Sequence, residues 1–522
     1  MNLFLLLDIP AMIDAEHEIV VDGSKRLTYG ALEEEVRTLA AALQARGVGI
    51  GDRIAYFETN RYEGIVLLFA CALIGATYVP LNYRAREDEL LYMLNRGEIK
   101  AIFAGTRYLP LVANVRKEVP TLQLVFSFGE GGDVSYAALL QEGSTLEPPF
   151  APPEEVGEDD LAVLMYTSGT TSKPKPVMLT HNDLSAYAMS QAEAFDGTDR
   201  GAAVAAAPFY HIAGLTGLVT SVYSGRRTVV IPQFEPKAWL KAVQEERCTF
   251  AFLVPTMLKR LLDDPEFDHT DLSSLETVSY GAAPMPAPVI EEAIARFPKT
   301  IGFVNSFGMT ETTSSVCVLG PDDHRIWEGT PEEQEKKRKR LRSVGKPLPD
   351  VEILIADEEG HSVPPGEVGR VLIRTQRAMK GYMGDEQATK AILRDDGFVV
   401  TDDMGYFDED GYLFLVGRHD DMIIRGGENI SPAEVEDVLA HHPKVADVAV
   451  IGIPSLEWGQ EVCAVVVPKD PTDPLTLEEL QDFCRERLAS FKKPTQLRIV
   501  DDFPRTTTGK IIKKALRETY AS

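Results

Sequence analysis

The stretch RTVVIPQFEPKAWLKAVQEERCTFAFLVP, residues 227–255, decides the fold class of this 522-residue chain. Two runs rich in β-branched and aromatic residues, RTVVIP and TFAFLVP, flank the amphipathic PKAWLKAVQEER. A strand, a helix and a second strand in this order form a βαβ unit, in which both strands run parallel and helices cover the sheet. The same alternation over most of the chain predicts an α/β fold with parallel αβα sheets in a large N-terminal domain.

Near Asp350 the sequence changes from alternating strand-like and helix-like runs to closely spaced strand-like runs. DVEILIADEEG and GEVGRVLIRT are typical of paired antiparallel strands. Residues 405–417, GYFDEDGYLFLVG, predict a hairpin that turns at Asp410 and Gly411. We therefore expect a small β-rich subdomain at about residues 345–417.

A further α+β unit of about 100 residues, a common domain size, follows this subdomain. Its first helix is predicted to begin after Ser431 as N-cap, with Pro432 at the first position and Glu434 completing a capping box. The expected organisation is an N-terminal domain at residues 1–417, a hinge at 418–421 and a mobile C-terminal lid domain at 422–522.

Composition limits the classes of function. A formal charge of −27 argues against nucleic acid as a partner, because phosphate binding needs basic faces. Five scattered cysteines indicate core thiols in a reducing compartment. The apolar start MNLFLLLDIPAMID lacks the basic region of a signal peptide, and residues 65–81 are too short and mixed for a membrane span. We expect a cytoplasmic protein with no transmembrane segment.

A loop rich in hydroxyls and glycine follows the strand-like LAVLM. The stretch YTSGTTSKPKPVMLTHNDL, residues 166–184, could wrap a phosphate or simply turn a corner. Its hydroxyl donors and flexible backbone suit an anion, and Lys173 and Lys175 add positive charge. The pattern GxxxxGK[ST] is absent, so a P-loop nucleotide site is excluded. The candidate phosphate-binding residues are Thr167, Ser168, Gly169, Thr170, Thr171 and Lys175.

Five further motifs follow in order: GAAP, NSFGMTETT, TDDMG, GRHDDMIIRGGENISPAEVE and PRTTTGKI. With these motifs the chain resembles the adenylate-forming superfamily of acyl- and aryl-CoA synthetases, peptide-synthetase adenylation domains and beetle luciferase. The resemblance covers nearly the whole chain and is closest to fatty- or aryl-acid CoA ligases. It implies ATP, Mg²⁺ and coenzyme A as cofactors and a small carboxylic acid as substrate.

The resemblance also implies a reaction in two steps. The acid attacks the α-phosphate of ATP to give acyl-AMP and pyrophosphate, and a thiol then displaces AMP. The first step brings anions together and needs cations and hydrogen-bond donors. By resemblance, Glu311 holds Mg²⁺, Thr310 donates to the α-phosphate, and Lys510 reaches the carboxylate and α-phosphate during adenylation.

The nucleotide-binding residues are assigned by the same resemblance. Phe307 stacks on the adenine and Asn305 bonds its edge, whereas Asp403 accepts from the ribose hydroxyls with help from Arg418. The remaining small residues expected at the nucleotide are Gly281, Ala282, Ala283 and Gly308. Each motif taken alone would be an ordinary turn.

Asp420 matches the family's hinge, where the C-terminal domain rotates after adenylation. Rotation is expected to withdraw Lys510 and to bring a glycine face toward the pantetheine arm of CoA. The residues assigned to CoA are Gly426, Gly427, Glu428, Trp458, Phe491 and Lys493. For Trp458, Phe491 and Lys493, core aromatics and a surface lysine are an equally open interpretation.

PFYHIAG, residues 208–214, places His211 where relatives keep an aromatic residue or histidine beside the acyl group. A packed core histidine is the alternative. Several residues near it are small, which favours a medium- or long-chain fatty acid or an aromatic acid over acetate. The expected acyl pocket consists of His211, Ile212, Ala213 and Ser306, with Gly214, Gly217 and Gly308 nearby.

Three departures from the family pattern leave alternatives open. Ser172 and Pro176 replace glycines of the phosphate loop, and Asp402 replaces the glycine of a TGD motif. Because proline removes an N–H donor, ATP binding could be weakened, as in an acyl- or nucleotide-binding sensor of little activity. Another alternative is a ligase that loads a carrier protein. The oligomeric state, a homodimer included, is left open.

Overall fold

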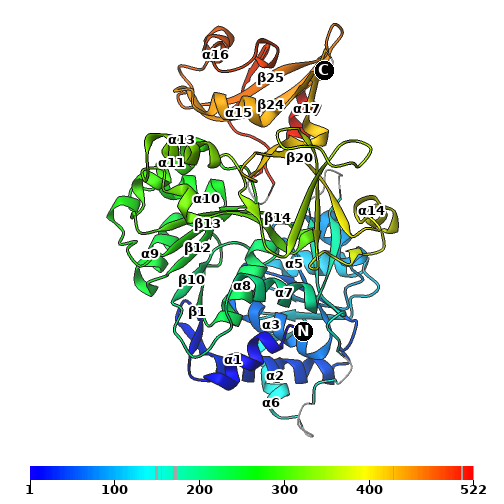
Figure 1. Cartoon of the computed structure of the whole chain (residues 1–522). Helices are drawn as coiled ribbons and strands as arrows, with labels where there is room; N and C mark the ends of the chain where they lie inside the picture. The colour runs from blue at the N-terminus through cyan, green and yellow to red at the C-terminus, as the bar shows by residue number, and fades with distance from the viewer. Residues whose placement is uncertain (147–150, 154–155, 168–172, 427, 507–509, 521–522) are drawn as a thin grey trace.

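The computed structural model describes residues 1–146, 151–153, 156–167, 173–426, 428–506 and 510–520. Within these residues the strands form four sheets. Two large sheets, sheet A in green and sheet B in blue, occupy the lower part of Figure 1. The C-terminal sheet, in orange, forms a separate layer above them (Figure 1).

Sheet A has nine strands in the order β16-β15-β14-β13-β12-β10-β11-β1-β2. Their bounds are β1 Glu18–Asp22, β2 Lys25–Thr28, β10 Ala202–Ala205, β11 Arg227–Val230, β12 Phe250–Leu253, β13 Thr277–Gly281, β14 Gly302–Met309, β15 Ser314–Leu319 and β16 Lys346–Pro347. Strands β1 and β10 to β14 pair in parallel, which confirms the predicted α/β class. The predicted βαβ unit is β11, helix α9 (Pro236–Glu246) and β12, with β10 between the two strands.

Sheet B has eight strands in the order β19-β9-β8-β4-β3-β5-β6-β7. Their bounds are β3 Arg53–Phe57, β4 Thr77–Pro80, β5 Ala101–Ala104, β6 Leu124–Ser127, β7 Val134–Ser135, β8 Leu161–Thr167, β9 Lys175–Thr180 and β19 Gly381–Tyr382. Strands β3 to β8 pair in parallel, and β9 and β19 are antiparallel to their neighbours. The most apolar stretch forms α3 (Tyr62–Ile74), which is buried on all sides and ends at Gly75 in the left-handed conformation.

The apolar start of the chain is part of the core. It forms α1 (Leu5–Ile13), whose Leu6 and Leu7 are buried with α2 (Tyr29–Ala45) and α8 (Ile212–Ser224) in one hydrophobic cluster. No helix in the described part of the chain is both long enough and apolar enough to cross a bilayer.

Sheet C lies where the β-rich subdomain was predicted. Its antiparallel strands are β17 Val351–Ala356, β18 Gly369–Thr375, β20 Phe398–Phe407 and β21 Leu413–Arg418. The predicted hairpin joins β20 to β21, and Gly411 in the left-handed conformation makes its turn. Before sheet C in the chain, the basic helix α13 (Pro331–Arg340) has no buried residue and is solvated.

The C-terminal sheet consists of β22 Ile423–Arg425, β23 Glu428–Ile430, β24 Val445–Ser455, β25 Gly459–Pro468 and β26 Gln496–Ile499. Helices α15 (Pro432–Ala440), α16 (Leu477–Cys484) and α17 (Lys513–Tyr520) accompany it. Ser431 caps α15 as predicted, but the predicted capping box is wrong. The Glu434 carboxylate bonds Lys492 at 2.7 Å instead of returning to the N-cap.

Candidate active site

From β10 the chain passes through α8 to β11 on one side, and from β11 it crosses back through α9 to β12 on the other side of β10. Such a change of direction opens a crevice at the carboxyl ends of the strands, where ligands bind in parallel sheets. Helix α8 follows β10 at this crevice, and the turn after β14 lies three strands further along the same edge. The predicted site residues around His211 and Glu311 are therefore carried to one edge of sheet A.

The predicted phosphate loop joins β8 to β9. Thr167 ends β8 and pairs with Lys175, the first residue of β9. Pro176 lies within β9 opposite Tyr166, and its carbonyl accepts from the N–H of Met383 at 2.9 Å. The proline therefore occupies a strand position, which explains why the missing N–H leaves the hairpin intact. Ser168, Gly169, Thr170, Thr171 and Ser172 lie outside the described residues.

Glu311 is a buried carboxylate, 8% exposed, in the short helical turn Thr310–Thr312 after β14. The hydroxyl of Tyr382 donates to its Oε1 at 2.7 Å. Burial raises the pKa of the Glu311 carboxyl, whereas Tyr382, Arg418 and Lys175 lower it. Lys175 lies with its Nζ 5.0 Å from the centre of the Tyr382 ring. Thr310 precedes Glu311 in the same turn, and its contact with the α-phosphate stays a prediction.

Arg377 fixes the turn that carries Glu311. Arg377 is 1% exposed, and its guanidinium donates to the carbonyls of Thr312, Thr313 and Ser315 and to Asp350 at 2.7 Å. Thr313 has a φ of 51°, a conformation that β-branched residues rarely adopt. Arg377 satisfies the carbonyl of this strained residue, so it is a positioning residue for Glu311. The sequence pattern did not reveal it.

Asp403 and Arg418 face each other across β20 and β21. Arg418 Nε lies 3.9 Å from the Asp403 carboxylate, and it is buried with no hydrogen-bond partner among the described residues. Burial raises the pKa of Asp403, and the positive charges of Arg418 and Lys510 lower it. A buried guanidinium donor without a partner is the kind of group that a polar ligand satisfies.

Lys510 reaches this pair from the C-terminal domain. Its segment is anchored by a bridge between Arg505 and Ile511 and by the N–H of Lys510, which donates to Thr506 Oγ1 at 3.1 Å. Burial lowers the pKa of the Lys510 ammonium, Arg418 lowers it further, and Asp403 raises it. The structure thus brings together Lys175, Glu311, Asp403, Arg418 and Lys510, which are distant in the sequence.

The predicted adenine-binding backbone lies where β13 ends. Gly281 pairs with Ser306 of β14, and a Cβ at position 281 would lie 2.1 Å from the Ser306 carbonyl oxygen. A Cβ at Gly308 would lie 1.8 Å from the carbonyl oxygen of Ser314. Packing between strands therefore explains both glycines without a ligand. Ala282 has a φ of 65°, and Ala283 follows it directly on the exposed edge.

The two predicted base contacts on β14 are partly used within the protein. The amide of Asn305 donates to the carbonyl of Ser343 at 3.2 Å, which leaves its carbonyl side for a ligand. Phe307 is half-buried against a small apolar cluster that includes Val316 and Cys317. Its ring is therefore fixed in place at the strand rather than free to adjust.

On the acyl side, His211 is the N-cap residue of α8. Its ring is tilted by 51° against that of Tyr210, with 4.4 Å between the centroids, and burial together with the charge of Arg84 lowers its pKa to about 4. The histidine is therefore neutral at physiological pH. Ile212 and Ala213 are the first two residues of α8. On β14, the hydroxyl of Ser306 lies 3.3 Å from that of Ser279.

The residues assigned to CoA gather on the C-terminal sheet. Gly426 has a φ of 58°, its N–H donates to the carbonyl of Trp458 at 2.8 Å, and a Cβ there would lie 2.9 Å from the indole. Arg425, which the sequence did not single out, lies over the Trp458 ring at 5.5 Å and donates to the Phe491 carbonyl at 2.8 Å. Gly427 lies outside the described residues. Glu428 pairs with Arg425 across the β22–β23 hairpin. Lys493 follows the short helical turn Ser490–Lys492.

The predicted hinge residue is loosely held. Asp420 is 59% exposed in the short helical turn His419–Asp421, and it contacts only its neighbour His419 among the ion pairs of the described residues. Asp421 bonds Arg517 of α17. The Asp420 side chain is therefore exposed, and the turn around it is closed by the N–H of Met422, which donates to the carbonyl of Arg418 at 3.1 Å.

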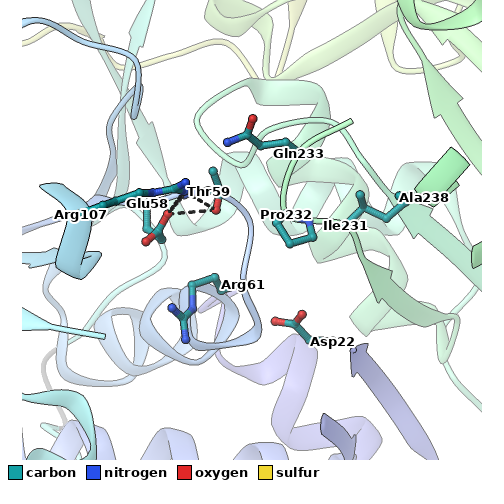
Figure 2. A pocket seen from close by; sticks show the side chains of 9 residues that line it. All are labelled: Asp22, Glu58, Thr59, Arg61, Arg107, Ile231, Pro232, Gln233 and Ala238. Carbon is teal, nitrogen blue, oxygen red and sulfur yellow. Dashed lines mark hydrogen bonds and ion pairs between the residues drawn. The ribbon is translucent and has the colours of Figure 1, made fainter. Parts of the chain in front are cut away.

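A cavity of about 620 Å³ is lined by residues that follow β3, β5 and β11. Figure 2 shows the side chains that line it. Its charged groups are already matched. Arg107 pairs with the buried Glu58, and Arg61 pairs with Glu63. Asp22 accepts the N–H of Tyr62 at 3.0 Å. The predicted catalytic residues do not line it.

Two protein-family models match this chain. Residues 8–383 match the model of the AMP-binding enzyme family, and residues 434–510 match that of the AMP-binding enzyme C-terminal domain. The chain belongs to the AMP-binding enzyme family. The resemblance predicted from its motifs is therefore confirmed.

Several named relatives of this AMP-binding enzyme are acid:CoA ligases, and one is a fatty acid–[acyl-carrier-protein] ligase of Streptomyces coeruleorubidus, 32% identical over 97% of this chain and 95% of its own. A feruloyl-CoA synthase of Amycolatopsis sp is 36% identical over 500 residues, which cover 95% of each chain. A 2-succinylbenzoate–CoA ligase of Bacillus licheniformis is 34% identical over 98% of this chain and its full length. The ATP-bound crystal structure of MatB from Rhodopseudomonas palustris superposes with a TM-score of 0.87 at 30% identity, over 100% of this chain and 99% of that one. The predicted fold and enzyme class are confirmed.

Proposed function

We propose that this AMP-binding enzyme is an ATP-dependent carboxylic acid:CoA ligase for a medium- or long-chain fatty acid or an aromatic acid. The observation that carries the proposal is the convergence of Lys175, Glu311, Asp403, Arg418 and Lys510 in one buried region. These residues come from sheet B, sheet A, sheet C and the C-terminal domain. Burying so many charges together is costly unless a ligand of matching charge completes the site.

In the first step, an oxygen of the acid's carboxylate forms a bond to the α-phosphorus of ATP. The bond to pyrophosphate breaks, and pyrophosphate leaves with its electron pair. Lys175 from sheet B and Lys510 from the C-terminal domain supply positive charge to this centre. Because they act from a desolvated region, each charge is worth more than it would be in water.

Glu311 is the residue that would hold Mg²⁺. Mg²⁺ is usually bound by one or two carboxylates together with substrate phosphates. A single buried carboxylate whose pKa is raised by burial, fixed by one hydrogen bond from Tyr382, fits this donor set. When bound, the cation supplies charge neutralisation at the phosphates, while Tyr382 orients the carboxylate.

The nucleotide is held by groups that the structure leaves available. Asp403 accepts from the ribose hydroxyls, and the unpartnered Nε of Arg418 donates to the same part of the ligand. The carbonyl of Asn305 accepts from the adenine edge, and Phe307 stacks on its face. The backbone of Ala282 in its left-handed conformation presents the strand end to the base.

The second step uses a different face of the C-terminal domain. We propose that Asp420 changes its backbone conformation, Lys510 withdraws, and the Gly426–Trp458 cluster approaches the acyl-AMP. Because Gly426 packs directly against the indole, the surface there is flat enough for a slender thiol arm. A carrier-protein thiol is the competing acceptor.

The test is a panel of carboxylic acids assayed for pyrophosphate release and for consumption of the CoA thiol. Release that depends on the acid, with matching loss of free thiol, is the expected result. Release without thiol loss would indicate a carrier-protein acceptor, and nucleotide binding without release would indicate a sensor. A cytoplasmic location and a homodimer stay predictions, which fractionation and light scattering would check.

A further inference from the structure

We propose that the acid carries an oxygen substituent at the end remote from its carboxylate, and that the hydroxyl of Thr228 recognises it. The inference rests on the proposed function, because it takes the crevice beside α8 as the acyl site. It adds a substrate class and a specificity residue to that site.

A small cavity extends from the His211 end of α8 into the molecule. Its volume is about 30 Å³. It is lined by Ala213, Gly217 and Ser221 of α8, Ala205 of β10, Thr228 of β11 and Phe252 of β12. Ala213 and Ser221 lie two helical turns apart, a distance of about 12 Å. A cavity of this volume accepts little more than one oxygen atom with its neighbouring carbon, so it suits the tip of a ligand rather than its whole body.

Gly217 marks the open side of this cavity. It is exposed although it lies in the middle of a helix that is otherwise largely buried, and a Cβ there would meet nothing within 4 Å. Gly214, one turn earlier, behaves differently, because a Cβ there would lie 2.3 Å from the carbonyl oxygen of Pro208. Close packing explains Gly214, whereas Gly217 leaves unfilled space for the body of an acyl group.

Thr228 closes the cavity at its far end. It is 1% exposed, and its Oγ1 has no hydrogen-bond partner in the part of the chain that the structure describes. Buried hydroxyls are almost always paired, so an unpaired one on a cavity wall indicates a missing partner. Thr216 of α8 shows the usual solution, since its Oγ1 donates to the carbonyl of Ile212 at 2.7 Å.

A second donor lies near Thr228, although it is not one of the residues that line the cavity. Arg226, two residues before Thr228, lies over the ring of Phe250 at 4.9 Å, and Phe250 also lines the cavity. The Nε of Arg226 is buried without a hydrogen-bond partner among the described residues. A guanidinium can only donate, and a threonine hydroxyl can donate. The far end of the cavity therefore favours a ligand atom that accepts hydrogen bonds.

An acceptor oxygen on an otherwise apolar acid meets these conditions. The walls between Ala213 and Thr228 are small and mostly apolar, so they select a slim body. A hydroxyl, methoxy or carbonyl oxygen at the tip of the acid would then accept from Thr228. Acids without such an oxygen leave the hydroxyl unpaired on binding, which a site of this kind penalises.

The experiment compares matched acids in the pyrophosphate-release assay: para-hydroxycinnamate against cinnamate, para-methoxycinnamate against para-methylcinnamate, and ω-hydroxydecanoate against decanoate. The wild-type enzyme should favour the oxygenated member of at least one pair by about tenfold in kcat/KM. Thr228→Val, which keeps the shape of the side chain, should bring that ratio close to one. Thr228→Ser should restore it.

Two control variants separate recognition from folding. Thr216→Val, whose hydroxyl is used within the helix, should leave the ratio unchanged. Gly217→Ala adds one methyl group to open space and favours the helix, so it should fold and should lower kcat/KM for both members of the preferred pair.

The inference is overturned if the wild type prefers the plain acids, or if its ratio survives in Thr228→Val. If no acid in the panel releases pyrophosphate, the proposed function itself fails and the inference falls with it. Activity without any preference would leave the proposed function standing and remove only the role of Thr228.

Discussion

The two sides of the active site are held in very different ways. Around Glu311 the backbone is fixed by the fully buried Arg377, whose guanidinium donates to the carbonyls of Thr312, Thr313 and Ser315. Lys510, in contrast, depends on a short bridge near the end of the chain and on a hinge whose Asp420 is exposed. The difference indicates a division of labour. In the proposed mechanism, the fixed side binds ATP, whereas the movable side supplies a charge that is needed in one step only.

The backbone on the fixed side, around Glu311, is strained. Thr313 and Ser314 have φ values of 51° and 74°, and such conformations cost about 1–3 kcal/mol each in residues other than glycine. They persist because the surrounding structure over-determines them, and here Arg377 does so. A site built on a movable loop could not hold Glu311 in a buried position at this cost.

The largest expected effect comes from Lys510→Ala. It removes a desolvated positive charge beside Asp403 and Arg418, so adenylation should slow by about 10³-fold. Thioester formation from supplied acyl-AMP should remain largely intact, because Lys510 serves the first step only. Pyrophosphate release and single-turnover thiol consumption measure the two steps. Lys514→Ala, on the exposed side of α17, is the control.

Equal loss of both half-reactions in Lys510→Ala would contradict the division between a fixed and a movable side. The lysine would then act as a permanent part of the site, and the exposed hinge would have no role in the reaction cycle.

Arg377→Met should have the next largest effect, on stability as well as activity. Several buried carbonyls would lose their donor, so the free energy of unfolding should fall by about 3 kcal/mol. Urea unfolding measures it. Arg374→Met, an exposed arginine of β18 paired with Glu352, is the matched control and should cost well under 1 kcal/mol. If both variants cost the same, Arg377 does not stabilise the strained turn.

The sequence predicted the parts of this site that depend on local patterns. The βαβ rhythm around residues 227–255 predicted sheet A, and Asp410 and Gly411 predicted the hairpin that places Arg418 opposite Asp403. It could not predict Tyr382 or Arg377, because both act through contacts with residues more than 60 positions away. Long-range partners of this kind leave no periodic signal.

Packing in the structure gives some glycines a role that differs from the predicted one. Gly281 and Gly308 were interpreted as space for a ligand, yet each is required because a neighbouring carbonyl occupies the Cβ position. Gly214, Gly217 and Gly308 were all expected near the acyl pocket, and of these three only Gly217 borders open space. Whether a glycine serves a strand or a ligand depends on its neighbours in three dimensions.

Asp420→Pro tests the movable side directly. Proline fixes φ near −65°, so the backbone change proposed for the second step should be hindered. Thioester formation should slow by about tenfold or more, while adenylation changes little. Asp420→Ala, which keeps the backbone free, should behave as wild type in both steps. Unchanged CoA thiolation in Asp420→Pro would refute the hinge assignment.

The smallest expected effect comes from Tyr382→Phe on the fixed side. Its hydroxyl donates to Glu311 Oε1 and so orients the carboxylate proposed to hold Mg²⁺. Loss of such an orienting hydrogen bond usually weakens metal affinity by about tenfold or more. Adenylation at saturating Mg²⁺ should therefore change little, while the Mg²⁺ concentration for half-maximal rate rises. Tyr406→Phe in β20, whose ring stacks on Phe414, should leave that concentration unchanged. An unaltered Mg²⁺ dependence in Tyr382→Phe would mean that burial and Arg377 alone fix Glu311, and that the fixed side needs no orienting hydroxyl.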